Sequence, residues 1–344
     1  MKILAFGDIH FHHQHRFSQI TPDGFTVREL EHLSCADTIL RVAKEENVDE
    51  IIFLGDLYQP VGDTISCQTQ LAVCTFIDKI RKEYKLHMLV GNHDWSSSTN
   101  NQYAHKLIPY KYWNNVIVYD TPQIVNDFVF MPFIPDDEEA QMFLAKIQDK
   151  ENKIVFSHLE LKGVDVGGGI LTKKGIEIIT LKQFKMTLQG HYHSGGNYGK
   201  NIQIAGSTQR LSFKDPGLSR NNILIYDTET NKVKRRSFEC PDWLIFDDSN
   251  INDILKADNN NYVKVDISMD ILLTDEIKAK LEKFKKTDIH IDVNRIKVNR
   301  QVTEEIKTEN EEDIIIQFVN KSENSEEQKI DLIDYGKKLL LRGK

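Results

Sequence analysis

Short apolar segments alternate with segments of helical periodicity over the first 240 residues of the chain. The apolar segments are rich in Ile, Val, Leu and Phe, and several end at Gly or Asp, which is typical of buried β-strands. We expect strands over residues 2–6, 50–54, 86–90, 116–119, 128–131, 153–156, 186–188 and 202–205. Helices are expected from near Ser34, a good N-cap, over about 65–83, and from 136–139, where acidic side chains suit the helix dipole. This alternation predicts an α/β fold.

Beyond this first domain, the pattern predicts two smaller units. Residues 240–260 are expected to form a linker, because Pro, Asp and Asn are frequent there. The elements that we expect around it are a β-hairpin at 222–226 and 232–238, strands at 262–267 and 289–298, and helices at about 274–286, 311–321 and 325–341. The predicted domains are therefore 1–240, a small β-α-β cap at 250–303 and a helical pair at 311–341.

The two C-terminal helices are expected to be amphipathic. Ile314, Ile315, Phe318 and Val319 fall on one stripe of the first helix. About thirty residues cannot build a core of their own, so this stripe must be buried against another surface. It could pack back on the cap domain, but the charged segment 304–313 between them favours a separate helical partner.

The composition is that of an ordinary globular protein with 40% apolar and 28% charged residues. The net charge of −8 argues against a protein whose whole surface coats nucleic acid, but it says nothing about a local site. The four cysteines have no CxxC spacing, which favours reduced thiols in a cytosol. We see neither a signal peptide nor an apolar segment of about 18 residues. A cytoplasmic protein without membrane contact is expected.

Five short blocks rich in Asp and His follow predicted strands. They are Gly7-Asp8-Ile9-His10, Gly55-Asp56, Gly91-Asn92-His93-Asp94, Ser157-His158 and Gly190-His191-Tyr192-His193. A Gly-Asp pair alone is usually only a turn, and a lone His is usually a core or surface residue, but five ordered blocks are hard to assign to coincidence. The mixture of oxygen and nitrogen donors suits Mn²⁺, Fe²⁺ or Zn²⁺ better than Ca²⁺ or Mg²⁺. The small residues before the blocks let the backbone turn tightly and bring ligands together.

The order of these blocks resembles the calcineurin-like metallophosphoesterase superfamily over about residues 1–210. Within it, the chain is most similar to the SbcD-type nucleases of DNA double-strand-break repair, through Gly55-Asp56-Leu57-Tyr58 and the Gly-Ser-Thr-Gln-Arg-Leu-Ser-Phe block at 206–213. Its compact length and helical tail are closest to the phage recombination nuclease subunits. The resemblance implies a four-layer α-β-β-α sandwich with a small α/β cap domain and a C-terminal helical pair.

The resemblance also implies the roles of the site residues. One metal ion would be held by Asp8, His10, Asp56 and His193, and Asp56 would bridge to a second ion completed by Asn92, His158 and His191. Two such ions, most simply Mn²⁺ but with Mg²⁺, Fe²⁺ or Zn²⁺ as alternatives, would lower the pKa of a shared water and clamp an in-line phosphoryl displacement. His93 would face the substrate as the catalytic residue.

Some residues near these blocks depart from the family or have two interpretations. Gln59 stands where several of these nucleases have a histidine, so a titrating role there is doubtful. Asp94 either orients His93 or is a solvated surface residue. His12, His13 and His15 are expected in a loop near the entrance of the site. The basic residues that could contact phosphates, or simply form a solvated hairpin edge, are Lys232, Lys234, Arg235 and Arg236, with Arg210, Lys214 and Arg220.

The function implied by the resemblance is a Mn²⁺-dependent DNA nuclease with 3′→5′ exonuclease and single-strand endonuclease activity in recombination and repair. Its expected partners are DNA and an SbcC-type coiled-coil ATPase that docks on the C-terminal helices; a homodimer is compatible with the sequence. The alternative is a dimetal phosphatase or cyclic-nucleotide phosphodiesterase. A metal-free scaffold is disfavoured because no ligand position is lost.

Overall fold

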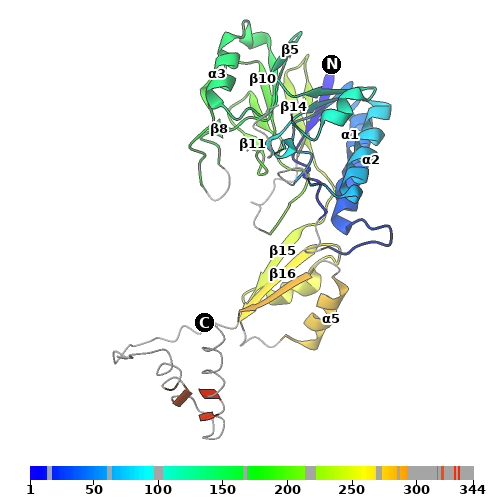
Figure 1. The fold of residues 1–344 in the computed structure, drawn as a ribbon, viewed down its shortest axis with the longest axis vertical. Helices are drawn as coiled ribbons and strands as arrows, with labels where there is room; N and C mark the ends of the chain where they lie inside the picture. The colour runs from blue at the N-terminus through cyan, green and yellow to red at the C-terminus, as the bar shows by residue number, and fades with distance from the viewer. Residues whose placement is uncertain are drawn as a thin grey trace. The chain divides into compact units, whose positions relative to one another are not determined.

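The computed structural model describes two compact units, residues 1–293 and 294–344. The described residues are 1–13, 18–59, 64–96, 104–165, 169–213, 222–268, 273–284 and 287–292, with 316, 319–320, 329–330 and 332–333 in the second unit. The first unit contains two six-stranded sheets and a separate three-stranded sheet (Figure 1). The mixed α/β fold predicted from the sequence is confirmed.

The first large sheet has the strand order β14-β13-β1-β2-β3-β4. Its strands are β1 (Lys2–Phe6), β2 (Glu50–Phe53), β3 (Lys85–Leu89), β4 (Val116–Tyr119), β13 (Ile223–Asp227) and β14 (Lys232–Arg236). The pairs from β1 to β4 are parallel, whereas β13 is antiparallel to β1. The helices α1 (Val27–Glu46) and α2 (Cys67–Glu83) pack on one face, where Leu4 and Phe6 contribute to the same core as Ile39 and Phe76.

The second large sheet has the order β11-β12-β10-β7-β6-β5. Its strands are β5 (Gln123–Val125), β6 (Phe128–Met131), β7 (Ile154–Ser157), β10 (Met186–Gln189), β11 (Gly196–Asn197) and β12 (Ile202–Ile204). The helices α3 (Asp137–Lys146) and α4 (Ile178–Leu181) share a core with its outer face, through Leu144 and Leu181 against Val129 and Val155. The remaining short elements of this part are η1 (Asn92–Asp94), η2 (Ile108–Tyr112), η3 (Lys150–Asn152), β8 (Leu161–Lys162) and β9 (Ile176–Glu177).

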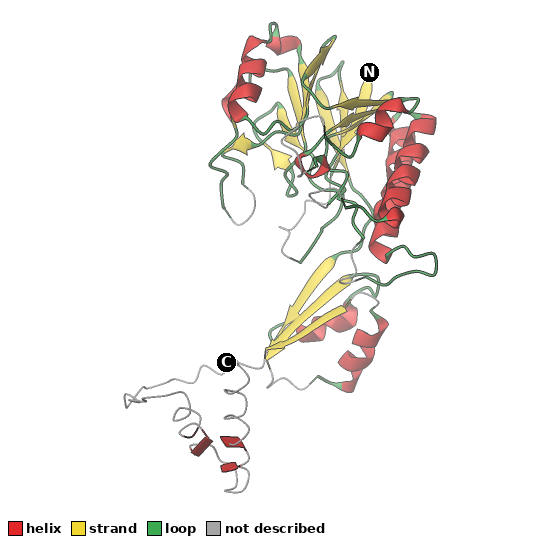
Figure 2. Ribbon diagram, viewed as in Figure 1, coloured by secondary structure: helices red, strands yellow, loops and turns green. Residues whose placement is uncertain are grey.

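The two large sheets pack against each other through a third core. Successive side chains of a strand point to opposite faces, so Ile3 and Ala5 of β1 face away from the helices. They meet Phe156 of β7 and Leu188 of β10 in one buried cluster. The helices therefore lie outside a pair of packed sheets, as the ribbon shows (Figure 2).

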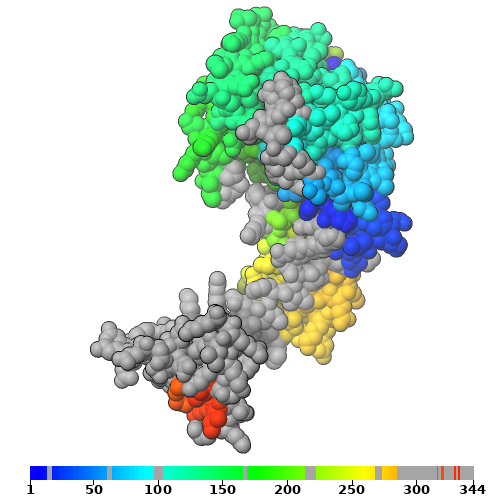
Figure 3. All heavy atoms as spheres, in the orientation of Figure 1, coloured from blue at the N-terminus to red at the C-terminus, as the bar shows by residue number. Residues whose placement is uncertain are grey.

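A small domain with its own core follows β14 in the sequence. Its parallel sheet has the order β15-β16-β17, formed by β15 (Trp243–Asp247), β16 (Tyr262–Ser268) and β17 (Thr287–Asp292), and it also contains η4 (Ile251–Lys256) and α5 (Asp275–Lys283). Ile277 and Leu281 of α5 pack with Val263 and Val265 of β16. The exposed face of α5 forms part of the surface in the space-filling view (Figure 3).

Two predicted boundaries were wrong. The expected linker at 240–260 contains β15 and η4, so the sheet of the small domain has three strands where two were expected. Helix α1 begins at Val27, and not near Ser34, because Thr26 is the N-cap of a capping box. The Thr26 hydroxyl accepts a hydrogen bond from the Glu29 N–H, and the Glu29 carboxylate accepts one from the Thr26 N–H. Ser34 lies inside the helix, where its hydroxyl donates to Glu31 O.

The helices predicted at 311–321 and 325–341 lie mostly outside the described residues. The seven described residues of this region are helical, with Val319 buried and Ile330 67% exposed. Among the described residues of the whole chain, no helix is long and apolar enough to cross a membrane.

Candidate metal centre

The five Asp- and His-rich blocks meet at the carboxyl ends of five strands. Three blocks follow β1, β2 and β3 of the first sheet, and two follow β7 and β10 of the second. Because neighbouring strands within each set run parallel, their carboxyl ends open toward the same edge. The fold thus brings the blocks together although they span residues 7–193 of the sequence.

The first group of candidate ligands consists of Asp8, His10 and His193. One ligand atom from each lies within 4.8 Å of the others. The Nε2 atoms of His10 and His193 are 3.0 Å apart. Asp8 and His10 are almost completely buried.

The second group consists of Asp56, His158 and His191, whose ligand atoms also lie within 4.8 Å of one another. Asn92 joins this group, because its Oδ1 lies 3.1 Å from His158 Nε2 and 3.0 Å from His191 Nδ1. All seven ligands predicted from the sequence are therefore brought together in two adjacent groups.

Asp56 lies between the two groups. Its Oδ2 atom is 3.3 Å from His158 Nε2 in one group and 3.6 Å from His10 Nε2 in the other. A carboxylate in this position can contribute to both sites.

The protonation states of buried donors in both groups suit the binding of cations. Asp8 Oδ1 is buried and has no hydrogen-bond partner among the described residues, although a buried carboxylate is costly unless it is paired or binds a metal. Burial, reinforced by the negative charge of Asp56, raises the pKa of Asp8 to about 6. Burial also lowers the pKa values of His10 and His191 to about 3, which keeps both imidazoles neutral, the form that binds metals. The donor set therefore fits two divalent cations.

His158 and Asp56 form a buried pair with opposite pKa shifts. Burial alone would lower the pKa of His158, but the negative charge of Asp56 outweighs it and raises this pKa to about 9. Burial likewise opposes ionisation of Asp56, but the charge of His158 and its hydrogen bond hold the Asp56 pKa well below its usual range. The Nδ1 atom of His158 is 2.6 Å from Leu54 O, so Nδ1 donates there, and Nε2 would bind a metal ion on releasing its own proton.

The backbone around the ligands is tightly constrained. Asp8, His10, Asp56 and His191 all have positive φ angles, between 55° and 73°, a region that non-glycine residues seldom adopt and that is common at functional sites. Gly91 leaves no room for a side chain, because a Cβ there would lie 2.2 Å from Asp56 Oδ1. The sequence predicted small residues before the blocks for tight turns, whereas at Gly91, with a φ of −92°, the requirement for glycine is steric.

His93 lies beside both groups. Its main-chain N–H donates to Asp56 Oδ1 at 2.9 Å, and its Nδ1 lies 2.8 Å from the main-chain oxygen of Gln59. The Gln59 carbonyl thus fixes the ring, a role that sequence reasoning missed because it considered only the Gln59 side chain. A ligand atom of His93 also lies within 4.8 Å of those of His10 and Asp56, so its assignment as a non-ligand stays a prediction.

One of the two interpretations of Asp94 was wrong: its side chain is fully buried, so it is no solvated surface residue. The partner of His93 Nδ1 is the Gln59 main-chain oxygen, so any influence of Asp94 on the His93 ring is indirect. The Asp94 carboxylate accepts hydrogen bonds from main-chain N–H groups at 2.9–3.1 Å; the donors are Asp56, Leu57, Tyr58 and Gly91. Lys106, which the sequence did not single out, donates to His93 O at 2.7 Å.

The basic residues of β14 are engaged within the fold. Lys234 and Arg236 pair with Glu46 at the end of α1. Arg235 donates to the main-chain oxygens of Gly196 and Ile204. These contacts favour the hairpin-edge interpretation over a surface reserved for DNA phosphates. Lys214, Arg220 and His15 lie outside the described residues.

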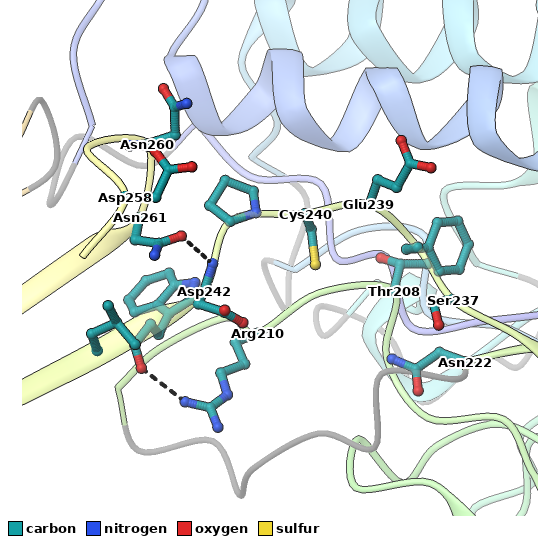
Figure 4. Close-up of a pocket in the computed structure, with 14 residues that line it drawn as sticks. Thr208, Arg210, Asn222, Ser237, Glu239, Cys240, Asp242, Asp258, Asn260 and Asn261 are labelled. Carbon is teal, nitrogen blue, oxygen red and sulfur yellow. Dashed lines mark hydrogen bonds between the residues drawn. The ribbon is translucent and has the colours of Figure 1, made fainter. Parts of the chain in front are cut away.

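A separate polar cavity of about 1000 Å³ lies between Thr208 and Asn222 on one side and the β15–β16 region on the other (Figure 4). Its lining residues are Thr208, Arg210, Asn222, residues 237–244, Asp258, Asn260 and Asn261. Arg210 donates through Nη1 to Trp243 O at 3.0 Å. None of the candidate metal ligands lines this cavity.

Comparisons with known proteins are consistent with this geometry. A family model described as calcineurin-like phosphoesterase matches residues 1–195. The candidate phosphoesterase 078R of Invertebrate iridescent virus 3 is 26% identical over 202 residues, which span 55% of this chain and 56% of that relative. The candidate phosphoesterase 244L of Invertebrate iridescent virus 6 is 26% identical over 236 residues, 65% of this chain and 74% of the relative.

Two solved structures are similar at 12% identity. A dimetal phosphatase from Danio rerio aligns with 69% of this chain and 96% of its own, with a TM-score of 0.35. The calcineurin-like phosphoesterase YfkN from Bacillus subtilis aligns with 69% of this chain and 93% of its own, with a TM-score of 0.30.

Proposed function

The chain belongs to the calcineurin-like phosphoesterase family, and from this premise we propose that it is a metal-dependent DNA nuclease. Membership and the candidate ligands make it a metallophosphoesterase with the residues for two metal ions. The proposal adds the substrate, DNA, and the native metal, Mn²⁺. The two-metal part of the proposal rests on the position of Asp56 Oδ2 between two groups of ligands, and the choice of DNA rests on the similarity of residues 206–213 to SbcD-type nucleases.

The donor set supports the metal proposal. Four imidazoles, two carboxylates and one amide oxygen form a mixed set that suits first-row divalent ions. Asp8, His10, Asp56 and His193 would hold one ion, and Asp56, Asn92, His158 and His191 the other. When bound, two such ions supply Lewis acidity to a phosphoryl group and activate water at neutral pH.

The protein's own groups have distinct tasks in this proposal. The Gln59 carbonyl holds His93 Nδ1, which directs Nε2 of that ring to act on the leaving oxygen of the substrate. A histidine can donate the proton that the leaving oxygen requires. The hydrogen bond from the His93 N–H to Asp56 Oδ1 fixes the position of His93 relative to the Asp56 carboxylate.

The block at 206–210 supports a nuclease over a small-molecule phosphatase. The block contacts the main chain of two candidate ligands. The Ser207 N–H donates to His193 O at 3.2 Å, and the Thr208 N–H donates to Asp8 O at 3.4 Å. This is the Gly-Ser-x-x-Arg block through which the sequence is similar to SbcD-type nucleases. Two divalent ions would bring a formal charge of +4 against −2 from Asp8 and Asp56, so the site can attract a phosphodiester despite the net charge of −8.

The substrate proposal is tested by offering four substrates side by side to the full chain loaded with Mn²⁺. They are linear duplex DNA, single-stranded DNA, a cyclic nucleotide and a phosphopeptide. A nuclease releases nucleotides from the DNA substrates and turns over the others far more slowly. Preference for the cyclic nucleotide or the phosphopeptide would establish the alternative, a phosphodiesterase or phosphatase. End-labelled DNA reports whether digestion runs 3′→5′.

The proposal extends to a partner for the C-terminal helices. The sequence predicts an apolar stripe at Ile314, Ile315, Phe318 and Val319, of which Val319 is buried in the structure. We propose that an SbcC-type coiled coil covers the remainder of this stripe. The test is to truncate the chain after Thr303 and measure nuclease activity on short single strands and binding to such an ATPase. Activity should survive and binding should be lost. Binding that survives truncation would refute the partner proposal.

A further inference from the structure

The segment that carries Asp56 and the segment that carries His93 bind each other through two carboxylates. Asp94 Oδ2 accepts from the Asp56 N–H at 3.0 Å and from the Gly91 N–H at 2.9 Å. Its Oδ1 accepts from the Leu57 N–H at 2.9 Å and from the Tyr58 N–H at 3.1 Å. A single side chain therefore ties three successive N–H groups of one segment to the start of the other.

The second carboxylate, that of Asp56, accepts a hydrogen bond from the segment that carries His93. Asp56 Oδ1 accepts a hydrogen bond from the His93 N–H at 2.9 Å. Asp56 Oδ1 is thus engaged in a hydrogen bond within the protein, whereas Oδ2 faces His158 and His10. The two hydrogen-bond sets fix both the position and the rotation of the Asp56 carboxylate.

This arrangement matters because the Asp56 backbone has an unfavourable conformation. Asp56 has a φ of 61°, and the preceding Gly55 has a φ of 103°. Such strain persists only where the surroundings enforce it. Asp94 is fully buried, and water cannot replace it easily as the acceptor for the N–H groups. Removing the carboxylate would leave buried donors unsatisfied, and the segment would relax to satisfy them.

We propose that Asp94 is a positioning residue for the metal centre: it holds the segment 56–58 so that Asp56 can serve both ion sites and His93 stays beside them. Asp94 acts through Asp56 and is not itself a ligand. This inference rests on the dimetal site of the proposed function and does not depend on DNA as the substrate.

The test is Mn²⁺ binding by the full-length chain after removal of bound metal with a chelator. Isothermal titration gives the number and affinity of the sites, and electron paramagnetic resonance detects the exchange interaction between two neighbouring Mn²⁺ ions. Asp94→Ala removes all acceptors, whereas Asp94→Asn keeps one oxygen for part of the N–H groups. Glu29→Gln is the matched control, because Glu29 is also a fully buried carboxylate that accepts hydrogen bonds, but at the α1 cap.

Wild type and Glu29→Gln should each bind two Mn²⁺ ions, and their electron paramagnetic resonance spectra should show the exchange interaction. Loss of groups that orient metal ligands typically weakens metal binding about 10- to 100-fold. We expect a weakening in this range for Asp94→Ala, with loss of the exchange signal, and a smaller effect for Asp94→Asn. If Asp94→Ala fails to fold, Asp94→Asn alone decides the question.

The failure of this inference can be distinguished from that of the proposed function. If wild type binds two ions and both Asp94 variants bind them equally well with the same exchange signal, the positioning role is refuted while the dimetal site stands. If wild type itself binds no pair of ions, the dimetal site and the role of Asp94 both fall.

Discussion

The Nε2 atoms of His10 and His193 lie 3.0 Å apart, although 183 positions separate the two residues in the sequence. His10 comes from the loop after β1 and His193 from the loop after β10, so the contact joins the two large sheets. One ligand atom of Asp8 lies within 4.8 Å of one ligand nitrogen of each histidine. Two imidazole nitrogens and a carboxylate that converge on one point form the first half of the proposed dimetal site.

Chelation should abolish activity. We expect the protein to lose DNA hydrolysis after treatment with EDTA and removal of the chelator, because the proposed mechanism relies on the bound metal ions to activate water. Activity should return when Mn²⁺ is added and less fully with Ca²⁺, which prefers oxygen ligands. The measurement is release of nucleotides from labelled DNA. Undiminished hydrolysis by metal-depleted protein would contradict the account.

Substitution of His93 should separate chemistry from metal binding. General acid catalysis is typically worth about 10²- to 10⁴-fold in rate, so His93→Ala should lose activity in this range and keep both ions. Asp56→Ala, by contrast, should lose metal, because Asp56 Oδ2 faces both groups. Metal content measured beside turnover distinguishes the two variants. Loss of an ion from His93→Ala would make His93 a ligand.

The contact between Gly91 and Asp56 gives a steric test. Gly91 has a φ of −92°, which alanine adopts without strain, but the added Cβ would lie 2.2 Å from Asp56 Oδ1. Gly91→Ala should therefore displace the Asp56 carboxylate and weaken metal binding. Gly169→Ala is the control, because no atom of the described residues lies within 4 Å of its Cβ position. Its positive φ should cost stability of about 1–2 kcal/mol without changing metal affinity.

The capping box of α1 predicts a pH-dependent stability. Burial disfavours the charged Glu29 carboxylate, but hydrogen bonds from Thr69, Thr26 and His13 outweigh burial, so the net effect is a pKa below its ordinary value of 4.5. Because the pKa is lower in the folded chain, its stabilisation is present above pH 4.5 and is lost as pH falls through the folded-state pKa. Glu29→Gln should reduce the free energy of unfolding at pH 7 by about 1 kcal/mol.

This difference between wild type and Glu29→Gln should narrow as pH falls below 4.5. Denaturant unfolding at several pH values measures it. A difference that stays constant down to pH 3 would show that the charge of Glu29 contributes nothing to the cap.

The sequence identified the side chains that converge at the candidate metal centre better than the groups that position them. Asp8, His10, Asn92 and His158 follow strands whose apolar pattern is plain, and chemistry-bearing side chains at strand ends can be recognised from residue type alone. The role of Asp94 could not be predicted, because it depends on where the N–H groups of residues 56–58 point. The same holds for the Gln59 carbonyl, since every residue has one and only the fold selects it.

Each of the two errors in element assignment has a specific physical cause. The start of α1 was misplaced because Ser34 is a good cap by type, whereas the pair Thr26 and Glu29 forms the actual capping box. Strand β15 was missed because Pro241 and Asp242 directly before it suggested a linker. Its Trp243 pairs in register with Tyr262 of β16, and their rings stack with centroids 4.2 Å apart. That long-range contact, and not local propensity, makes the segment a strand.

The most direct test of the dimetal centre is anomalous X-ray diffraction from crystals of the full chain grown with Mn²⁺. Two anomalous peaks should appear about 3.5–4 Å apart, on either side of the Asp56 carboxylate, one beside His10 and His193 and the other beside His158 and His191. A single peak, or peaks away from Asp56, would contradict the two-metal account.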